Sequence, residues 1–284
     1  MIGSLLMKKN AKKIDFKENS YILVGGLIIC VIFIIALLGP YFLRYDPLEV
    51  NGSQRLLNPS LNHFFGTDQY GRDVLSRIIY GIRNSVTIGI LVVLISTFLG
   101  ILIGVIAGYY DYLDNILMRI LDGIMAFPGI IIAITLCAVW GFGKRNIILA
   151  LSFSYFPTMA RIVRANVMSI KKSEAVDSIR TIGASDFYII YKYILLNSLA
   201  PIIVQATFIF ATSILDEAAL SFLGVGIKLP LPSLGGMMTE AKEFMLVAPL
   251  QIIIPGVVIM IIVLGLNLLG DGLRDYLDPK IKKR

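Results

Sequence analysis

Six apolar runs, each of about 20 residues, constrain the fold of this 284-residue chain more than any other feature. They lie at about residues 21–43, 84–108, 116–140, 147–168, 199–222 and 250–269. A helix needs about 20 apolar residues to cross the hydrocarbon core of a bilayer, because each residue adds about 1.5 Å along its axis. With 57% hydrophobic and only 16% charged residues, the sequence predicts an all-α, polytopic membrane protein with six transmembrane helices.

The distribution of basic residues predicts the orientation of these helices. Six spans put both ends of the chain on one side of the membrane. Of the 26 Lys and Arg residues, 17 lie in segments on that side and 9 on the other. By the positive-inside rule both termini are expected in the cytoplasm. The first run is longer than a signal-peptide core and no A-x-A-like cleavage site follows it, so we expect it to be retained.

These boundaries predict the organisation of the chain. Residues 1–20 form a cytoplasmic tail, 21–43 the first transmembrane helix, and 44–83 an extracellular segment. Residues 84–271 form a five-helix transmembrane domain that includes a cytoplasmic region at 170–197, and residues 272–284 form a second cytoplasmic tail. Within the extracellular segment, Asp68, Arg72 and Asp73 are interpreted as a local charge network rather than a ligand site.

A polar island at residues 174–204 interrupts the apolar pattern. It carries Glu174, Asp177, Arg180 and Asp186, and Gly183 separates two short runs with helical periodicity. The island is too polar to span a bilayer and too regular to be an unstructured loop. We interpret it as a cytosolic surface that contacts another protein.

The sequence contains no pattern typical of an enzyme or a metal site. The phosphate-binding motif G-x-x-x-x-G-K-[ST] is absent, and His63 is the only histidine. Cys30 and Cys137 lie inside apolar runs and are expected to be free thiols. We therefore predict no catalytic residue, no metal site and no cofactor in this chain. Any energy for transport must come from a partner or an ion gradient.

Five segments carry a family resemblance that covers the chain from about Phe65 to its end. They read FGTDQYGRDVLSRIIYGIRNS, LMRILDGIMAFP, DSIRTIGASDFYIIYKYILLN, LDEAALSFLGVG and NLLGDGLRDYLDP. In this order they resemble the permease subunits of ATP-binding-cassette (ABC) importers of the dipeptide, oligopeptide and nickel family. The first and last segments resemble the second, shorter permease of the pair. The resemblance implies a type I ABC importer permease fold.

The resemblance also implies a coupling helix that docks on a cytosolic ATPase. The residues at the matching positions are Asp177, Arg180, Gly183, Ala184, Ser185 and Asp186. The family motif usually has Glu-Ala-Ala where this chain has Asp177, Ser178 and Ile179, and proline where it has Leu196. Because of these departures, the sequence predicts where the coupling helix lies more firmly than it predicts the individual contacts with the ATPase.

Acidic residues inside the fifth apolar run are candidates for the transport pathway. Charged groups inside a membrane are costly, so Asp216 and Glu217 are candidates for lining the translocation cavity or its outer gate. The alternative is an internal hydrogen-bonded pair that never touches substrate. Asp122 and Arg119 are one helical turn apart and are interpreted as a structural ion pair. The tyrosine cluster at 109–112 is interpreted as an interfacial anchor.

The function implied is import of di- or oligopeptides across a bacterial cell membrane by alternating access. The implied partners are a second homologous permease, two cytosolic ATPases that hydrolyse ATP, an extracytoplasmic solute-binding protein and membrane lipid, with no nucleic acid. Import of nickel or a metallophore complex remains an alternative. A stand-alone secondary transporter that uses Asp216 and Glu217 is a more distant one, since such proteins commonly contain paired internal repeats and none is evident here.

Overall fold

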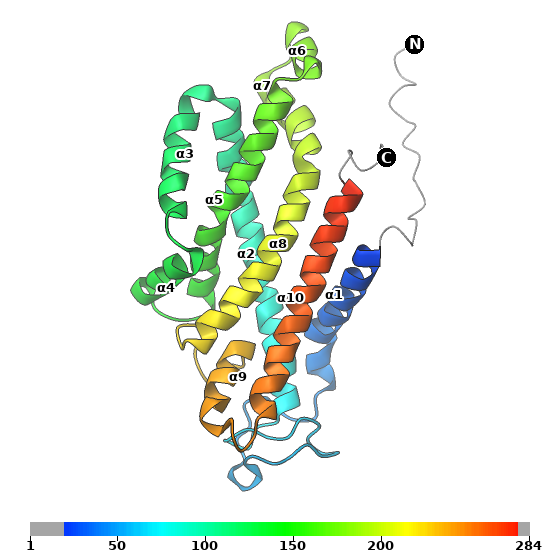
Figure 1. The fold of residues 1–284 in the computed structure, drawn as a ribbon, viewed down its shortest axis with the longest axis vertical. Helices are drawn as coiled ribbons and strands as arrows, with labels where there is room; N and C mark the ends of the chain where they lie inside the picture. The colour runs from blue at the N-terminus through cyan, green and yellow to red at the C-terminus, as the bar shows by residue number, and fades with distance from the viewer. Residues whose placement is uncertain (1–19, 278–284) are drawn as a thin grey trace.

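The computed structural model describes residues 20–277, and these residues form a bundle of long helices (Figure 1). The helices are α1 (Ser20–Leu38), η1 (Gly39–Phe42), η2 (Gly52–Gln54), α2 (Val74–Tyr109), α3 (Asp111–Met125), α4 (Gly129–Trp140), α5 (Lys144–Lys171), α6 (Glu174–Thr181), α7 (Asp186–Tyr188), η3 (Ile189–Leu195), α8 (Leu196–Phe222), α9 (Leu234–Ala241), η4 (Lys242–Phe244) and α10 (Leu250–Leu277). The all-α, polytopic prediction is confirmed. The basic residues expected in the tails at 1–19 and 278–284 lie outside the described residues.

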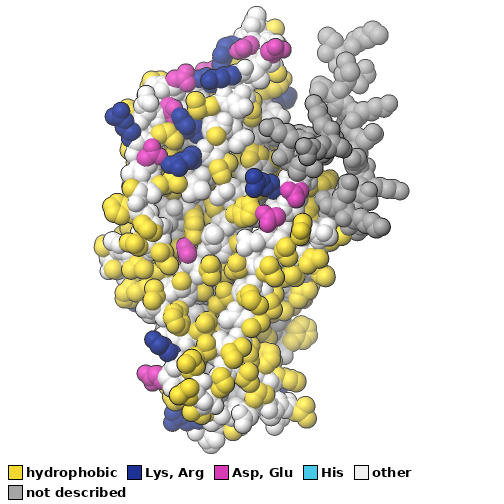
Figure 2. All heavy atoms as spheres, in the orientation of Figure 1, with side chains coloured by type: hydrophobic (Ala, Val, Ile, Leu, Met, Phe, Trp, Pro, Cys, Tyr) yellow, Lys and Arg dark blue, Asp and Glu magenta, His cyan; other side chains and the backbone are white. Residues whose placement is uncertain are grey.

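Within residues 20–277, five helices are long and apolar enough to cross a membrane. The bent pair α3 and α4 would supply a sixth span. The bundle has two distinct ends in Figure 1, with α6 at one and α9 together with the segment before α2 at the other. Acidic and basic side chains gather toward the α6 end, while hydrophobic side chains cover the middle of the bundle (Figure 2).

The third expected span is not one straight helix. The chain bends by 84° between α3 and α4. Pro128 explains the break, because it lacks a backbone N–H and disfavours the helical conformation at Phe127. Asp122 also forms a different contact from the one expected, because it pairs with Arg161 of α5 at 2.6 Å and not with Arg119.

Two other helices are longer than their apolar runs indicated. Helix α2 begins at Val74, inside the segment expected to be extracellular, because the Asp73 side chain accepts a hydrogen bond from the Ser76 amide and caps it. At 36 residues it is about 54 Å long, well beyond the thickness of a bilayer core. The fifth span continues without interruption from Asp186 to Phe222. Its η3 part is a π-helix, whose turn is wider than that of an α-helix.

Helix α2 packs against α5 along a row of small residues. Gly100, Gly104 and Gly108 recur every four residues and therefore share one face of α2. A Cβ atom at Gly104 would lie 2.6 Å from the carbonyl oxygen of Ala160, and one at Gly108 would lie 2.7 Å from the Cβ of Val167. Glycines at this spacing let two membrane helices approach closely.

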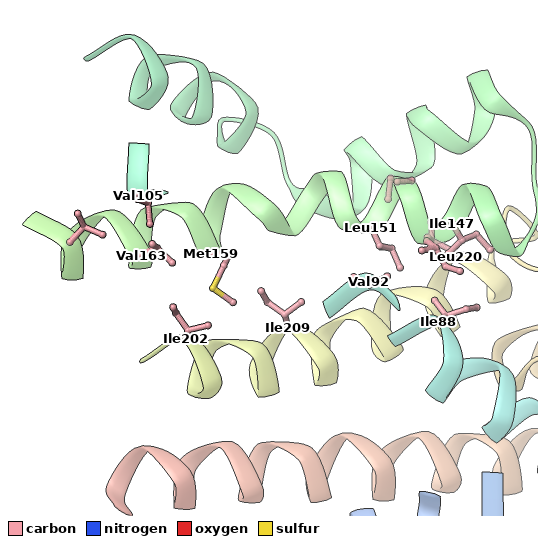
Figure 3. Close-up of a cluster of buried hydrophobic side chains, with 14 of the residues drawn as sticks. Ile88, Val92, Val105, Ile147, Leu151, Met159, Val163, Ile202, Ile209 and Leu220 are labelled. Carbon is pink, nitrogen blue, oxygen red and sulfur yellow. The ribbon is translucent and has the colours of Figure 1, made fainter. Parts of the chain in front are cut away.

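The main hydrophobic core lies where α2, α5 and α8 meet. Figure 3 shows side chains from all three helices in this core, among them Val92 of α2, Leu151 of α5 and Ile209 of α8. A second cluster joins α1, α2, α8, α9 and α10. The core therefore holds the helices that carry both the polar island and the intramembrane acids.

The α2–α5 contact predicts a difference between two glycine substitutions. Gly104→Ala places a methyl group against the Ala160 carbonyl and should destabilise the protein by about 1–3 kcal/mol. Gly123→Ala on α3 is the matched control, since no atom lies within 4 Å of its added Cβ. Heating the purified variants in detergent and measuring the fraction that stays monodisperse should show a lower midpoint only for Gly104→Ala. Equal midpoints would contradict the close packing.

Candidate functional site

The polar island forms a compact helix–turn–helix at one end of the bundle. Helix α6 ends at Thr181, and Gly183, two residues later, adopts a left-handed backbone conformation with φ of 87°. There the Gly183 amide donates to the Arg180 carbonyl at 3.0 Å and the Ala184 amide donates to the Ile179 carbonyl at 3.3 Å. Glycine is favoured because a Cβ atom is strained in this conformation. The two helical runs expected on either side of Gly183 are present as α6 and α7.

Tyr109 ties this loop to the end of α2. Its hydroxyl donates a hydrogen bond to the Asp186 carboxylate and accepts one from Arg180 at 3.4 Å. Its backbone carbonyl accepts from the Lys171 ammonium at 2.7 Å. Tyr109 is buried, so it does not act as the interfacial anchor expected for this cluster, whereas Tyr112 is exposed. Tyr109 therefore joins α2, α5, α6 and α7 at one point.

Most of the residues predicted for coupling build the loop itself. Gly183 makes the turn, and the Ser185 hydroxyl accepts from the Tyr188 amide at 3.4 Å and caps α7. Ala184 packs against the main core. Arg180 and Asp186 contact Tyr109 as described above. Asp177 lies on an exposed part of α6.

A set of exposed apolar side chains, not singled out from the sequence, lies beside these residues. We call it the docking face, and it consists of Ile182, Phe187, Tyr188 and Tyr191. Ile182 is 83% exposed and Phe187 is 79% exposed. The rings of Phe187 and Tyr191 are parallel, with 6.3 Å between their centroids. The one sequence signal was the four-residue spacing of Phe187 and Tyr191, which puts both on one helix face.

The two intramembrane acids contact different helices. Glu217 is fully buried, and its carboxylate accepts hydrogen bonds from Ser85 of α2 and Ser221 of α8, both at 2.8 Å. Asp216 is half-buried and accepts from the hydroxyl of Tyr155 on α5 at 2.5 Å. The structure therefore does not bring the two carboxylates together on one surface. Instead, Glu217 joins α8 to α2 and Asp216 joins α8 to α5.

The charge network expected at Asp68 and Arg72 is present and extends further than the sequence indicated. Arg72 pairs with Asp68 at 2.6 Å and with Glu240 of α9 at 3.0 Å. Glu240 also pairs with the buried Arg77 of α2 at 2.6 Å. Asp73 contacts the His63 ring at 2.9 Å. The network fastens the segment before α2 to α9 at the end of the bundle opposite the polar island (Figure 1).

Comparison with known proteins now identifies the family. Residues 100–283 match the model of the binding-protein-dependent transport system inner membrane component, and residues 14–59 match the N-terminal transmembrane domain of oligopeptide transport permease C. The chain belongs to this ABC importer permease family. Its place among the dipeptide and oligopeptide permeases, predicted from the five segments, is confirmed.

The permease is similar to several full-length relatives. It is 42% identical over 269 residues to the dipeptide transport system permease protein DppC of Alkalihalophilus pseudofirmus, covering 94% of this chain and 88% of that one. It is 40% identical to the glutathione transport system permease protein GsiD of Pectobacterium atrosepticum, covering 94% and 89%. As a subunit of an ABC importer, the permease works with ATPase and substrate-binding components.

A solved structure supports the type I fold. The permease superposes on a chain of the methionine ABC transporter MetNI in an inward-facing conformation with a TM-score of 0.60. The match covers 71% of this chain and 96% of that chain, at 18% identity. The permease is therefore a multi-pass membrane protein with the fold expected from its sequence.

The charge network predicts a strong effect of one carboxylate. Glu240→Ala leaves the buried Arg72 and Arg77 side chains to share Asp68, and removing one partner of a buried pair costs about 3–5 kcal/mol. The midpoint of thermal denaturation should fall clearly. Glu243→Ala, at an exposed position three residues later, is the matched control and should leave the midpoint unchanged. Identical midpoints would show that the network does not hold α9.

Proposed function

We propose that this permease imports short peptides as one of two membrane subunits of an ATP-driven transporter. The observation that carries the proposal is the docking face, an exposed apolar surface on a loop that Tyr109 ties to the transmembrane helices. Exposed apolar side chains clustered beside charged ones favour a protein partner. The family provides ATPase subunits as that partner.

Short peptides are the proposed substrates because of the relatives the chain is similar to. Their names assign dipeptides to one and glutathione to another, and both are short peptides. No described contact favours nickel or a metal chelate over a peptide. The further partners in this proposal are a second, homologous permease and an extracytoplasmic solute-binding protein.

The proposed orientation puts the polar island in the cytoplasm of a bacterial cell, with both termini on the same side. The excess of basic residues in the segments on that side supports it. The segment before α2 and helix α9 would then meet the solute-binding protein outside the membrane. Asp177, Arg180, Gly183, Ala184, Ser185 and Asp186 would form and position the joint with the ATPase.

Alternating access is the proposed mechanism, and the helix connections suggest how motion is transmitted. The ATPases can shift the permease between states only if they bind those states with different affinity. A movement of the docking face would pass directly into α8, since the chain is helical from Asp186 through η3 to Phe222. The contacts of Tyr109 would pass it to α2.

Asp216 and Glu217 are proposed as elements of the outer gate. Each joins α8 to another helix near the end where α9 lies, and these contacts would hold the outer half of the bundle closed. In this proposal their role is to fasten helices in one state of the cycle rather than to bind a cationic substrate.

The docking face predicts loss of ATPase binding when its aromatic rings are removed. Burial of each ring contributes about 1.5–3 kcal/mol. Phe187→Ala combined with Tyr191→Ala should therefore weaken association with the ATPase subunits about 100-fold or more. Co-purification of the ATPases through a tag on the permease measures the effect.

Phe64→Ala is the matched control for this experiment, because Phe64 is 62% exposed at the opposite end of the bundle. This variant should retain the ATPase subunits at the wild-type ratio. If the double variant also retains the ATPase subunits at the wild-type ratio, the ATPase binds elsewhere and the proposed coupling is contradicted.

The gate predicts unequal effects of neutralising the two acids. Glu217→Gln replaces one carboxylate oxygen by an NH₂ group, so one of the Ser85 and Ser221 hydroxyls loses its acceptor, a cost of about 1–3 kcal/mol. Peptide uptake at equal membrane expression should fall about tenfold. Asp216→Asn keeps an oxygen that can accept from Tyr155 and should change uptake much less. If Glu217→Gln takes up peptide at the wild-type rate, Glu217 is not part of the gate.

A further inference from the structure

A cavity of about 710 Å³ lies between α5, α8 and α10. Asn166 near the end of α5, Asn197 at the start of α8 and Arg274 near the end of α10 line it toward the α6 end of the bundle. Gln205 and Phe208 line it deeper along α8. None of these residues belongs to the docking face, the outer gate or the charge network.

The two asparagines present hydrogen-bond acceptors in this cavity. The Asn166 NH₂ group donates to the Ile162 carbonyl at 2.8 Å, and the Asn197 NH₂ group donates to the Tyr193 carbonyl at 2.5 Å. One N–H of each NH₂ group is directed to a carbonyl of its own helix, and each side-chain oxygen accepts no hydrogen bond from residues 20–277. Pro201 also lines the cavity and has no N–H, so the Asn197 backbone carbonyl lacks its usual α-helical donor.

Gln205 adds both a donor and an acceptor at greater depth. It is half-buried in the body of a membrane-spanning helix, and its side chain makes no hydrogen bond within residues 20–277. A primary amide in such a place is costly unless something polar binds it. Arg274 likewise has no ion-pair partner among the described residues, so its positive charge is available to an anionic group.

The arrangement matches the chemistry of a peptide main chain. Amide oxygens accept from peptide N–H groups or an ammonium, the Gln205 NH₂ donates to a peptide carbonyl, and a guanidinium binds a terminal carboxylate. Asn197 and Gln205 are eight residues apart, which is about 12 Å along α8. That is the length of three to four residues of extended peptide.

We infer that this cavity is a peptide-contact site of the permease, in which Asn166, Asn197, Gln205 and Arg274 bind the peptide main chain and its carboxylate. The inference rests on the proposed function and names the residues that would meet the substrate. The headgroup of an anionic lipid could pair with Arg274. Its acyl chains, however, have no hydrogen-bonding group for the amide of Gln205, two helical turns deeper.

Transport by the assembled transporter in proteoliposomes tests the inference. Gln205→Leu keeps the size of the side chain and removes its hydrogen bonding. The initial uptake rate of a labelled mixture of di- and tripeptides should fall at least tenfold, while the variant still co-purifies with the ATPase subunits at the wild-type ratio. Thr135→Val on the exposed face of α4 is the matched control and should leave the uptake rate unchanged.

A second measurement reports occupancy directly. In a background of Cys30→Ala and Cys137→Ala, Gln205→Cys is labelled with a hydrophilic maleimide in nanodiscs, with and without the same peptide mixture. Peptide should slow labelling at position 205 at least threefold and leave labelling of Leu61→Cys, at a 90% exposed position in the segment before α2, unchanged. Slower labelling caused by phosphatidylglycerol instead of peptide would assign the cavity to lipid and overturn the inference.

The outcomes separate this inference from the proposed function. If the wild-type transporter takes up the peptides and Gln205→Leu takes them up equally fast, the inference is wrong and the proposed function stands. If the wild-type transporter takes up no peptide, the proposed substrate class is wrong and the inference fails with it.

Discussion

The close approach of α2 and α5 is the contact on which the rest of the structure depends. Gly100, Gly104 and Gly108 present no side chain, so the backbone of α5 can lie against α2 where lipid offers little hydrophobic driving force for helix association. The residue after the last of these glycines is Tyr109. Close packing therefore brings the end of α5 near enough for the Lys171 ammonium to donate a hydrogen bond to the Tyr109 carbonyl.

The same packing joins the polar island to the helices that line the cavity. Helix α5 carries Asn166 and runs directly into the island, and the island runs through η3 into α8, which carries Asn197 and Gln205. No flexible linker separates the docking face from α8. In the proposed mechanism, a displacement of the island by the ATPase would change the walls of the cavity, provided that the ATPase binds the two arrangements with different affinity.

Polar contacts at the α9 end have a different character. The ion pairs of Glu240 with Arg72 and Arg77 and the hydrogen bonds of Glu217 link segments far apart in the sequence through buried, partnered groups. Buried charges that are fully partnered favour one arrangement strongly, because any opening leaves a charge without a partner. This end therefore favours one defined conformation, whereas the side chains of the docking face at the other end are exposed.

The sequence by itself determined the membrane class, the approximate spans, the polar island and its turn at Gly183, because hydrophobic length and left-handed glycine turns are local properties. The five segments that resemble the permease family also indicated the family. Only the tertiary structure decided that Tyr109 holds the island, that Asp122 pairs with Arg161, that Asp216 and Glu217 join different helices and that Gln205 lies in a cavity. Some of these contacts join residues dozens of positions apart, and the others depend on which face of a helix points inward. Helix packing decides both the pairing and the orientation, and no local pattern in one sequence specifies that packing.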